Sequence, residues 1–170
     1  MPRICVCGLD DMPQMVDQLR PGRLISLLPA AEQPPTPRQL KASDHLRVLI
    51  DDIDRPEPGF CAPGRLHVEK LLGFLHASPP TASLVIHCLA GVSRSPAAAL
   101  IALSLDAPGR EREAASLLRR AAPFASPNRL LVQLADTALG CAGTLVAAVD
   151  SIGEPEASLA FKPFLLPRVL

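Results

Sequence analysis

The amino-acid sequence predicts an α/β fold with a central, mostly parallel β-sheet flanked by helices and a helical C-terminal half. In the first half, short apolar segments alternate with segments of helical periodicity, an order typical of a parallel sheet covered by helices. The second half has helical patterns only. The chain has 170 residues, of which 48% are hydrophobic, enough to bury a proper core. We therefore expect a single domain over residues 1–170.

Four strands are expected, each short, apolar and followed by turn-forming or polar residues. They cover residues 3–7, 23–28, 46–53 and 84–87. The third strand is apolar and then acidic, so its carboxyl end should bring Asp51, Asp52 and Asp54 into a proline-rich loop. Residues 30–37 are predicted to form a loop, because their prolines cannot donate to a sheet.

Helices are expected between and after these strands. They cover residues 10–19, 64–76, a segment that follows the last strand and ends at Leu105, and residues 111–121, 127–139 and 141–149. A break at Pro108 and Gly109 separates two of them. Residues 154–170 combine prolines with large apolar side chains, and we expect them to pack on the domain as an irregular strap.

Composition argues against several classes of protein. Seventeen basic residues balance seventeen acidic ones, so the positive field that attracts nucleic acid is missing. No apolar run approaches the roughly 18 residues of a membrane-spanning helix, and no basic segment precedes an apolar one at the start. We expect no membrane association and a cytoplasmic location. The absence of Trp and Tyr, with 19 prolines, is typical of a high-GC bacterial genome.

The five cysteines are irregularly spaced, which suits neither a disulfide framework nor paired zinc ligands. We expect no metal ion and no cofactor. Among the histidines, His87 at a strand end is expected to orient the following loop through hydrogen bonds. The other three, His45, His67 and His76, lack ligand spacing and are expected at the surface.

The most informative segment, HCLAGVSRSP at residues 87–96, joins a strand directly to a helix. Backbone N–H groups converge at such a junction and bind anions. The residues expected to surround the anion are Leu89, Ala90, Gly91, Val92, Ser93 and Arg94. Cys88 stands at the mouth of this loop, where its thiolate is stabilised as a nucleophile. Arg94 can hold two phosphoryl oxygens with its planar fork, and Ser95 can donate its hydroxyl to the sulfur.

This segment resembles the phosphate loop of the dual-specificity branch of the protein tyrosine phosphatases, whose pattern is HCxxGxxRS. A second match lies downstream, where Pro127, Asn128, Gln133 and Leu134 fit the PN-x-x-x-x-QL pattern of the same family. The two matches and the order of elements extend over residues 4–137. The resemblance implies a phosphatase-like fold, and it implies that Asn128 supports the active-site region.

The resemblance also implies a general acid, an aspartate on a loop that follows a strand before the cysteine. Asp51, Asp52 and Asp54 all qualify. The alternation of Val48, Ile50 and Asp52 would place Asp52 on one strand face and Asp51 on the other, so we expect Asp52 to be the acid. The other two aspartates remain alternatives, as does a solvated acidic turn without a catalytic role.

The chemistry expected is metal-independent hydrolysis of phosphate monoesters through a cysteinyl-phosphate. The loop carries no lysine, which disfavours phosphoinositides and favours phosphotyrosine or phosphoserine/threonine in proteins. The alternatives are a catalytically silent phospho-binding module and a phosphatase of small, non-protein phosphate esters. A disulfide between the nucleophile and Cys5 or Cys7, as in some relatives of this family, also stays open. No feature indicates an oligomeric state.

Overall fold

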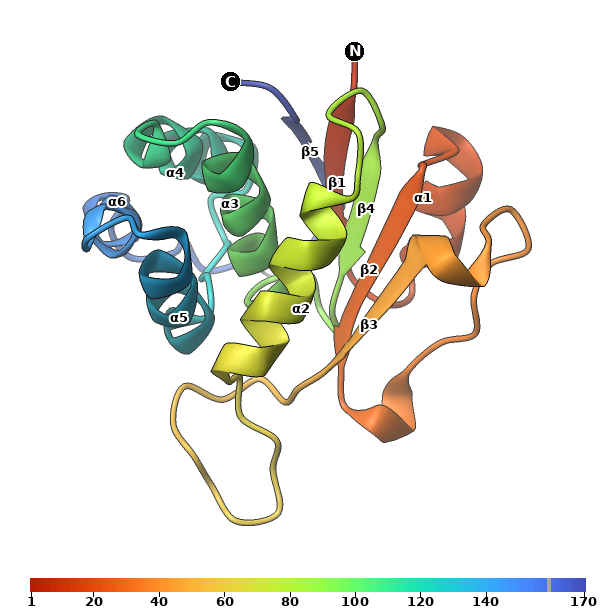
Figure 1. The fold of residues 1–170 in the computed structure, drawn as a ribbon, viewed down its shortest axis with the longest axis horizontal. Helices are drawn as coiled ribbons and strands as arrows, with labels where there is room; N and C mark the ends of the chain where they lie inside the picture. The colour runs from red at the N-terminus through yellow and green to blue at the C-terminus, as the bar shows by residue number, and fades with distance from the viewer. Residues whose placement is uncertain (159) are drawn as a thin grey trace.

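The computed structural model describes residues 1–158 and 160–170, which alternate strands and helices up to α3 and are helical from there to α6 (Figure 1). The strands are β1 (Arg3–Cys7), β2 (Arg23–Leu28), β3 (His45–Leu49), β4 (Leu84–His87) and β5 (Phe164–Pro167). The α-helices are α1 (Met12–Leu19), α2 (Arg65–His76), α3 (Arg94–Asp106), α4 (Glu111–Ala121), α5 (Arg129–Leu139) and α6 (Thr144–Ser151). None of the helices in these residues has the length and apolar character needed to cross a bilayer.

The sheet has the strand order β3-β2-β4-β1-β5. The first four strands are parallel, and only β5 runs antiparallel, paired with β1. The predicted α/β class with a mostly parallel central sheet is therefore confirmed. Because the four parallel strands run the same way, their carboxyl ends lie along one edge, where α/β proteins usually bind ligands.

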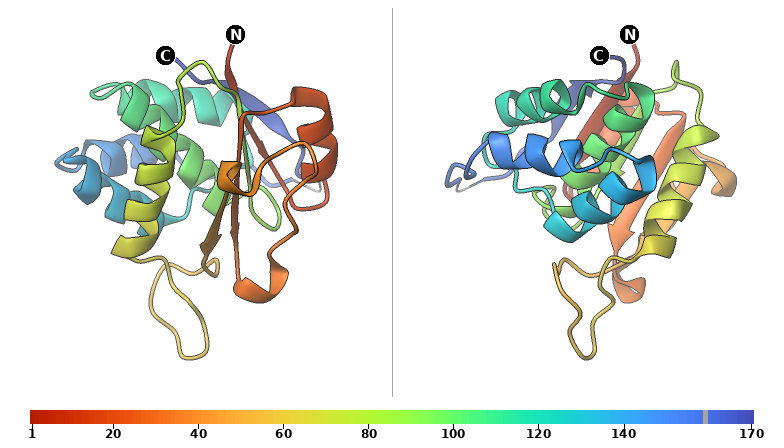
Figure 2. Two further views of the ribbon diagram at one scale, coloured as in Figure 1. Left: turned by 45° about the vertical axis from the view of Figure 1, so that its right-hand side comes forward. Right: turned by 60° about the vertical axis from the view of Figure 1, so that its left-hand side comes forward.

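Helices cover both faces of the sheet unequally. Figures 1 and 2 show α1 on one face and the other helices on the opposite face. The α1 face buries a small cluster made of Cys5, Cys7, Met12, Val16, Leu24 and Val85. The main core lies on the other face, and α3 passes through it with every residue from Arg94 to Ser104 buried. The loop that precedes α3 is thus attached to the buried end of this helix.

The strand expected over residues 46–53 is wrong at its carboxyl end, because β3 stops at Leu49. Ile50 N donates the last hydrogen bond to the β2 backbone, at 3.2 Å, and β2 itself ends there. Asp51 N donates instead to the carbonyl oxygen of Cys61, at 2.8 Å. The segment between β3 and α2, residues 50–64 and hereafter the acid loop, therefore leaves the sheet and projects below it in Figure 1.

The C-terminal strap is also more regular than expected, because four of its residues form β5. The outer edge of β1 leaves backbone groups unpaired, and β5 satisfies them. Arg168 then anchors the end of the chain with a completely buried side chain. Its Nε lies 3.2 Å from Asp106 Oδ2, and its Nη atoms donate to carbonyl groups of Ser78 and Ala82.

The remaining elements are confirmed with shifted ends. The helix expected from Cys141 begins instead at Thr144. The Asp136 carboxylate accepts hydrogen bonds from backbone N–H groups at the start of α6 and so fixes its first turn. Asn128 caps α5 in the same way, since its Oδ1 accepts from Leu131 N at 3.0 Å.

Candidate active site

The loop of residues 88–93 connects β4 to α3 at the carboxyl edge of the sheet. Neighbouring segments hold its carbonyl groups. The bonds run from Leu9 N to Leu89 O (2.9 Å), from Ser126 N to Val92 O (2.9 Å) and from Asn128 N to Ser93 O (3.1 Å). In the described part of the chain, none of the backbone N–H groups of residues 89–94 has a protein acceptor. The peptides are thus turned so that their acceptors are satisfied and their donors are free, an arrangement that binds anions.

The loop also lies directly against the end of β1. Gly91 has φ +76°, and a Cβ there would lie 2.7 Å from the carbonyl carbon of Cys7 and 2.8 Å from Gly8 N. A Cβ on Gly8 would in turn lie 3.1 Å from the Leu89 oxygen. Only glycine allows this left-handed conformation and this close approach together.

Cys88 begins the loop and is almost fully buried. Its Sγ lies 3.1 Å from Ser95 Oγ, so the hydroxyl can donate to a thiolate. Cys5 and Cys7 are free thiols on the α1 side of the sheet. The hydrogen bond that the Cys7 thiol donates to Cys5, together with burial, raises the pKa of Cys7 and keeps it protonated at neutral pH. Cys88, in contrast, lies at the start of the loop whose N–H groups, at residues 89–94, are free.

Arg94 is the first residue of α3 and has only 4% of its surface exposed. Its Nη1 donates to the Ile50 carbonyl at 3.0 Å, which orients the guanidinium. Its Nε is buried and has no hydrogen-bond partner among the described residues, although Asp52 Oδ2 lies 3.8 Å away. A buried, unsatisfied cationic donor is costly, and an anion in the loop would remove that cost.

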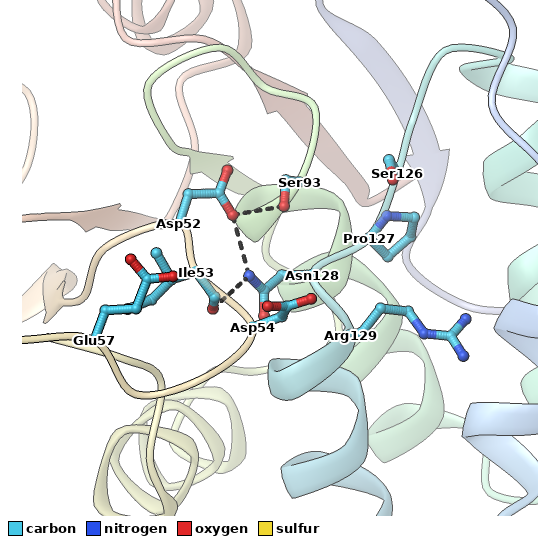
Figure 3. Close-up of a pocket in the computed structure, with 9 residues that line it drawn as sticks. All are labelled: Asp52, Ile53, Asp54, Glu57, Ser93, Ser126, Pro127, Asn128 and Arg129. Atoms are coloured by element: carbon cyan, nitrogen blue, oxygen red, sulfur yellow. Dashed lines mark hydrogen bonds between the residues drawn. The ribbon is translucent and has the colours of Figure 1, made fainter. Parts of the chain in front are cut away.

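Asp52, on the acid loop, lies against the 88–93 loop at Ser93. Its Oδ1 accepts from Ser93 Oγ at 2.7 Å and from Asn128 Nδ2 at 3.1 Å (Figure 3). Asn128 Nδ2 also donates to the Ile53 carbonyl, at 3.2 Å. Asn128 therefore links the acid loop to α5 and holds Asp52 over the 88–93 loop.

The three candidate aspartates have different surroundings. The Asp51 carboxylate accepts from Cys61 N at 2.7 Å and, with the return bond between their backbones, closes the neck of the acid loop. Asp54 lines a neighbouring cavity and makes no bond to the 88–93 loop. Of the three, Asp52 is the one that forms a hydrogen bond to that loop in the described part of the chain. The strand alternation used to select it was wrong, however, because Asp52 lies beyond the end of β3.

A cavity of about 410 Å³ opens beside the 88–93 loop, between the acid loop and the start of α5 (Figure 3). It is lined by Asp52, Ile53, Asp54, Glu57, Ser93, Ser126, Pro127, Asn128 and Arg129. Cys88 and Arg94 are not part of its lining. Arg129 is paired with Asp150 and Glu57 with Arg55, so Asp54 is the charged residue of the lining without an ion-pair partner among the described residues. In residues 1–158 and 160–170 no group of three or more His, Cys, Asp or Glu side chains suits a metal ion.

His87 and His45 belong to one buried hydrogen-bond network. His87 Nδ1 lies 3.3 Å from the Cys88 carbonyl oxygen, and Ser26 Oγ lies between the two rings, 2.6 Å from His87 and 2.8 Å from His45. The surface position expected for His45 is wrong, since only 6% of its surface is exposed. Burial lowers the pKa of each histidine to about 4. The only signal of this network in the sequence is Ser26, a polar residue inside an apolar strand.

This protein is similar to known proteins in its three-dimensional structure, and its similarity is to solved phosphatase structures. Neither a protein-family model nor a curated protein matches the sequence. The PTP-2 phosphatase of Cydia pomonella superimposes with a TM-score of 0.62 at 24% identity, over 79% of this chain and 84% of that one. DUSP15 gives 0.61 at 17% identity, over 89% and 91%. The chain has the dual-specificity phosphatase fold.

The Yvh1 phosphatase domain of Chaetomium thermophilum shares this phosphatase fold, with a TM-score of 0.57 at 23% identity over 81% of this chain and 92% of that domain. Identities this low establish the fold alone. The phosphatase fold accounts for the strand order and for the position of the 88–93 loop at the sheet edge. Activity has to be argued from the side chains in the site.

Proposed function

We propose that the protein is a metal-independent phosphatase of the dual-specificity type that hydrolyses phosphate monoesters, with Cys88 as its nucleophile. The observation that carries this proposal is the arrangement of donors around one buried thiol. The free N–H groups of residues 89–94 and the unpartnered Nε of Arg94 surround the place where a phosphoryl group would lie in front of Cys88. Such preorganised donors stabilise charge that develops in a transition state.

In the first step, the Cys88 thiolate attacks phosphorus in line with the ester oxygen. The S–P bond forms as the P–O bond to the leaving group breaks, and Asp52 gives its proton to the departing oxygen. The guanidinium of Arg94 and the loop N–H groups hold the three equatorial oxygens throughout. The position of Asp52 over the loop, held by Ser93 and Asn128, supports this role.

In the second step, water attacks the cysteinyl-phosphate. Asp52, now a carboxylate, takes a proton from that water, and inorganic phosphate leaves as the S–P bond breaks. The sulfur departs as a thiolate. The Ser95 hydroxyl, 3.1 Å from Sγ, supports this departure because it can donate a hydrogen bond to the developing charge.

The surroundings of the loop favour phosphotyrosine or phosphoserine/threonine in proteins as the substrate. Asp54 lines the neighbouring cavity without an ion-pair partner among the described residues and would repel the additional phosphates of a phosphoinositide. Phe60, on the same acid loop, has 57% of its surface exposed and is thus available to contact a substrate, which argues against a core role. Small phosphate esters fit the same chemistry and serve as test substrates.

The decisive experiment measures hydrolysis of 4-nitrophenyl phosphate without added metal and with EDTA present. The wild type should be active and inhibited by vanadate, and Cys88→Ser should be inactive. Cys141→Ser, which alters a half-buried cysteine far along the chain, is the matched control and should retain activity. A folded wild type that binds vanadate without hydrolysing the ester would contradict the proposal and support the silent phospho-binding module.

A further inference from the structure

A continuous row of side-chain hydrogen bonds crosses the sheet from β3 through β2 to β4 and ends on the nucleophile's own carbonyl group. It joins Arg47 Nη2 to Thr36 Oγ1 (3.0 Å), Thr36 Oγ1 to His45 Nδ1 (3.0 Å), His45 Nε2 to Ser26 Oγ (2.8 Å), Ser26 Oγ to His87 Nε2 (2.6 Å) and His87 Nδ1 to Cys88 O (3.3 Å). Ser26, His45 and His87 are all buried. The strands place them in contact, since Ser26 pairs directly with His87 in the β2–β4 register.

The direction of every bond in this row follows from its last member. The Cys88 carbonyl can only accept, so Nδ1 of His87 carries the proton. In a neutral ring Nε2 of His87 is then an acceptor, and Ser26 must donate to it. The Ser26 oxygen is left to accept from Nε2–H of His45. His45 Nδ1 is therefore an acceptor, which requires the Thr36 hydroxyl to donate.

The opposite end of the row is compatible with this direction. Arg47 can only donate, so it leaves the Thr36 hydrogen free to point at His45. Arg47 also donates to the Pro34 carbonyl at 3.0 Å, which fixes the segment that carries Thr36. Both rings stay neutral at pH 7. Burial lowers the pKa of each to about 4, and the charges that face them, Arg47 for His45 and Arg94 for His87, act in the same direction.

We propose that Thr36, His45 and Ser26 are positioning residues that fix His87 in its Nδ1–H tautomer. In that tautomer His87 donates to the Cys88 carbonyl and holds this oxygen away from the anion site, so the site presents donors only. The opposite tautomer would place a ring lone pair against the carbonyl oxygen and push this peptide out of place. The effect on turnover rests on the proposed phosphatase function, whereas the tautomers and the reactivity of the thiol do not.

The tautomers can be read directly from ¹H–¹⁵N correlation spectra of the folded protein labelled on its four histidines, at pH 7. We expect His87 as the Nδ1–H form and His45 as the Nε2–H form. His67 and His76 lie outside the row and serve as internal references. Finding His87 as the Nε2–H form, or either ring as an imidazolium, would overturn the proposal.

The second measurement is the rate at which iodoacetamide alkylates Cys88 between pH 5 and 9, followed on the Cys88 peptide by mass spectrometry. Ser26→Ala interrupts the row at its centre. We expect the Cys88 alkylation rate at pH 7 to fall about fivefold, the effect of one net hydrogen bond, with the pH profile moving to higher pH. Ser104→Ala is the matched control, since Ser104 is an equally buried serine on α3 whose hydroxyl has no partner among the described residues.

Thr36 provides a second pair of variants in case Ser26→Ala does not fold. Its side chain is only half-buried, so Thr36→Val should fold, remove the hydroxyl and lower the alkylation rate, whereas Thr36→Ser should keep the wild-type rate. Equal rates in Thr36→Val and Thr36→Ser, or in Ser26→Ala and Ser104→Ala, would refute the proposal. A wild type without ester hydrolysis would refute the proposed function and leave these comparisons intact.

Discussion

Asp52→Asn is the substitution that best tests how the site works. The change removes the transferable proton while keeping the shape of the side chain. The amide oxygen can still accept from Ser93 Oγ, which lies 2.7 Å from Oδ1, so the position over the loop should be retained. The hydrogen bond from Asn128 Nδ2, at 3.1 Å, can be kept on the same oxygen. The variant therefore isolates proton transfer from loop geometry.

The size of the effect should depend on the leaving group. General acid catalysis contributes about 10²–10⁴-fold when the leaving oxygen needs a proton. Phenyl phosphate has such a leaving group, and we expect kcat/KM for it, which reports the steps up to the cysteinyl-phosphate, to fall by about that factor in Asp52→Asn. The 4-nitrophenolate ion is stable without a proton, so its release should fall far less. The assay compares kcat/KM for the two esters in wild type and variant, because kcat also includes hydrolysis of the cysteinyl-phosphate, which is the same for both esters.

Asp51→Asn is the matched control on the adjacent residue. The Asp51 carboxylate holds Cys61 N at 2.7 Å and forms no hydrogen bond to the 88–93 loop among the described residues, so its loss should slow both esters by a similar factor. A fall in kcat/KM of Asp52→Asn that is equal for both esters would refute the assignment of Asp52 as general acid. A leaving-group difference that appears in Asp51→Asn instead would move the role to that residue.

Three further outcomes follow from particular contacts. Gly91→Ala should abolish hydrolysis and destabilise the fold by about 2–5 kcal/mol in urea unfolding, because left-handed strain adds to a steric overlap at 2.7 Å. Arg168→Met should lower the free energy of unfolding by about 1–3 kcal/mol, because it leaves the Ser78 and Ala82 carbonyl groups without their donor. His45 and His87 have their pKa values lowered from 6.5 to about 4, so the unfolded chain binds protons that the folded chain excludes. The free energy of unfolding should therefore fall as the pH drops from 6.5 to 4, by at most about 3 kcal/mol for each ring. This loss should be smaller in His45→Gln, which has one titrating ring fewer.

Each of these outcomes has its own control. Gly59→Ala has a similar φ of +85° with nothing within 4 Å of the new Cβ, so it should show the conformational strain without the overlap. Equal losses in the two glycine variants would contradict the role of the overlap. Arg65→Met removes an exposed pair with Glu69 and should change stability very little. An acid-induced loss of stability that is identical in wild type and His45→Gln would show that His45 does not titrate as described.

The sequence determined the fold class and the central part of the candidate site. Alternating strand and helix patterns are local properties, so the parallel sheet and its helices were predictable within a few residues. The 88–93 loop was also predictable, because residues 87–96 encode the end of a strand, a turn that requires glycine, and the start of a helix in one continuous segment. Cys88, Arg94 and Ser95 lie within that segment, and no distant contact is needed to bring them together.

Only the tertiary structure decided which distant residues complete the site. Asp52 and Asn128 are far apart in the chain, and their bond depends on where β3 ends and how α5 packs. The true end of β3 is set by the length of its partner strand, which the sequence of β3 does not contain. Ser26 and His45 meet His87 because β3, β2 and β4 lie side by side, and strand order is a long-range property. Local residue patterns specify elements, whereas the pairing of elements places side chains from remote segments at one edge of the sheet.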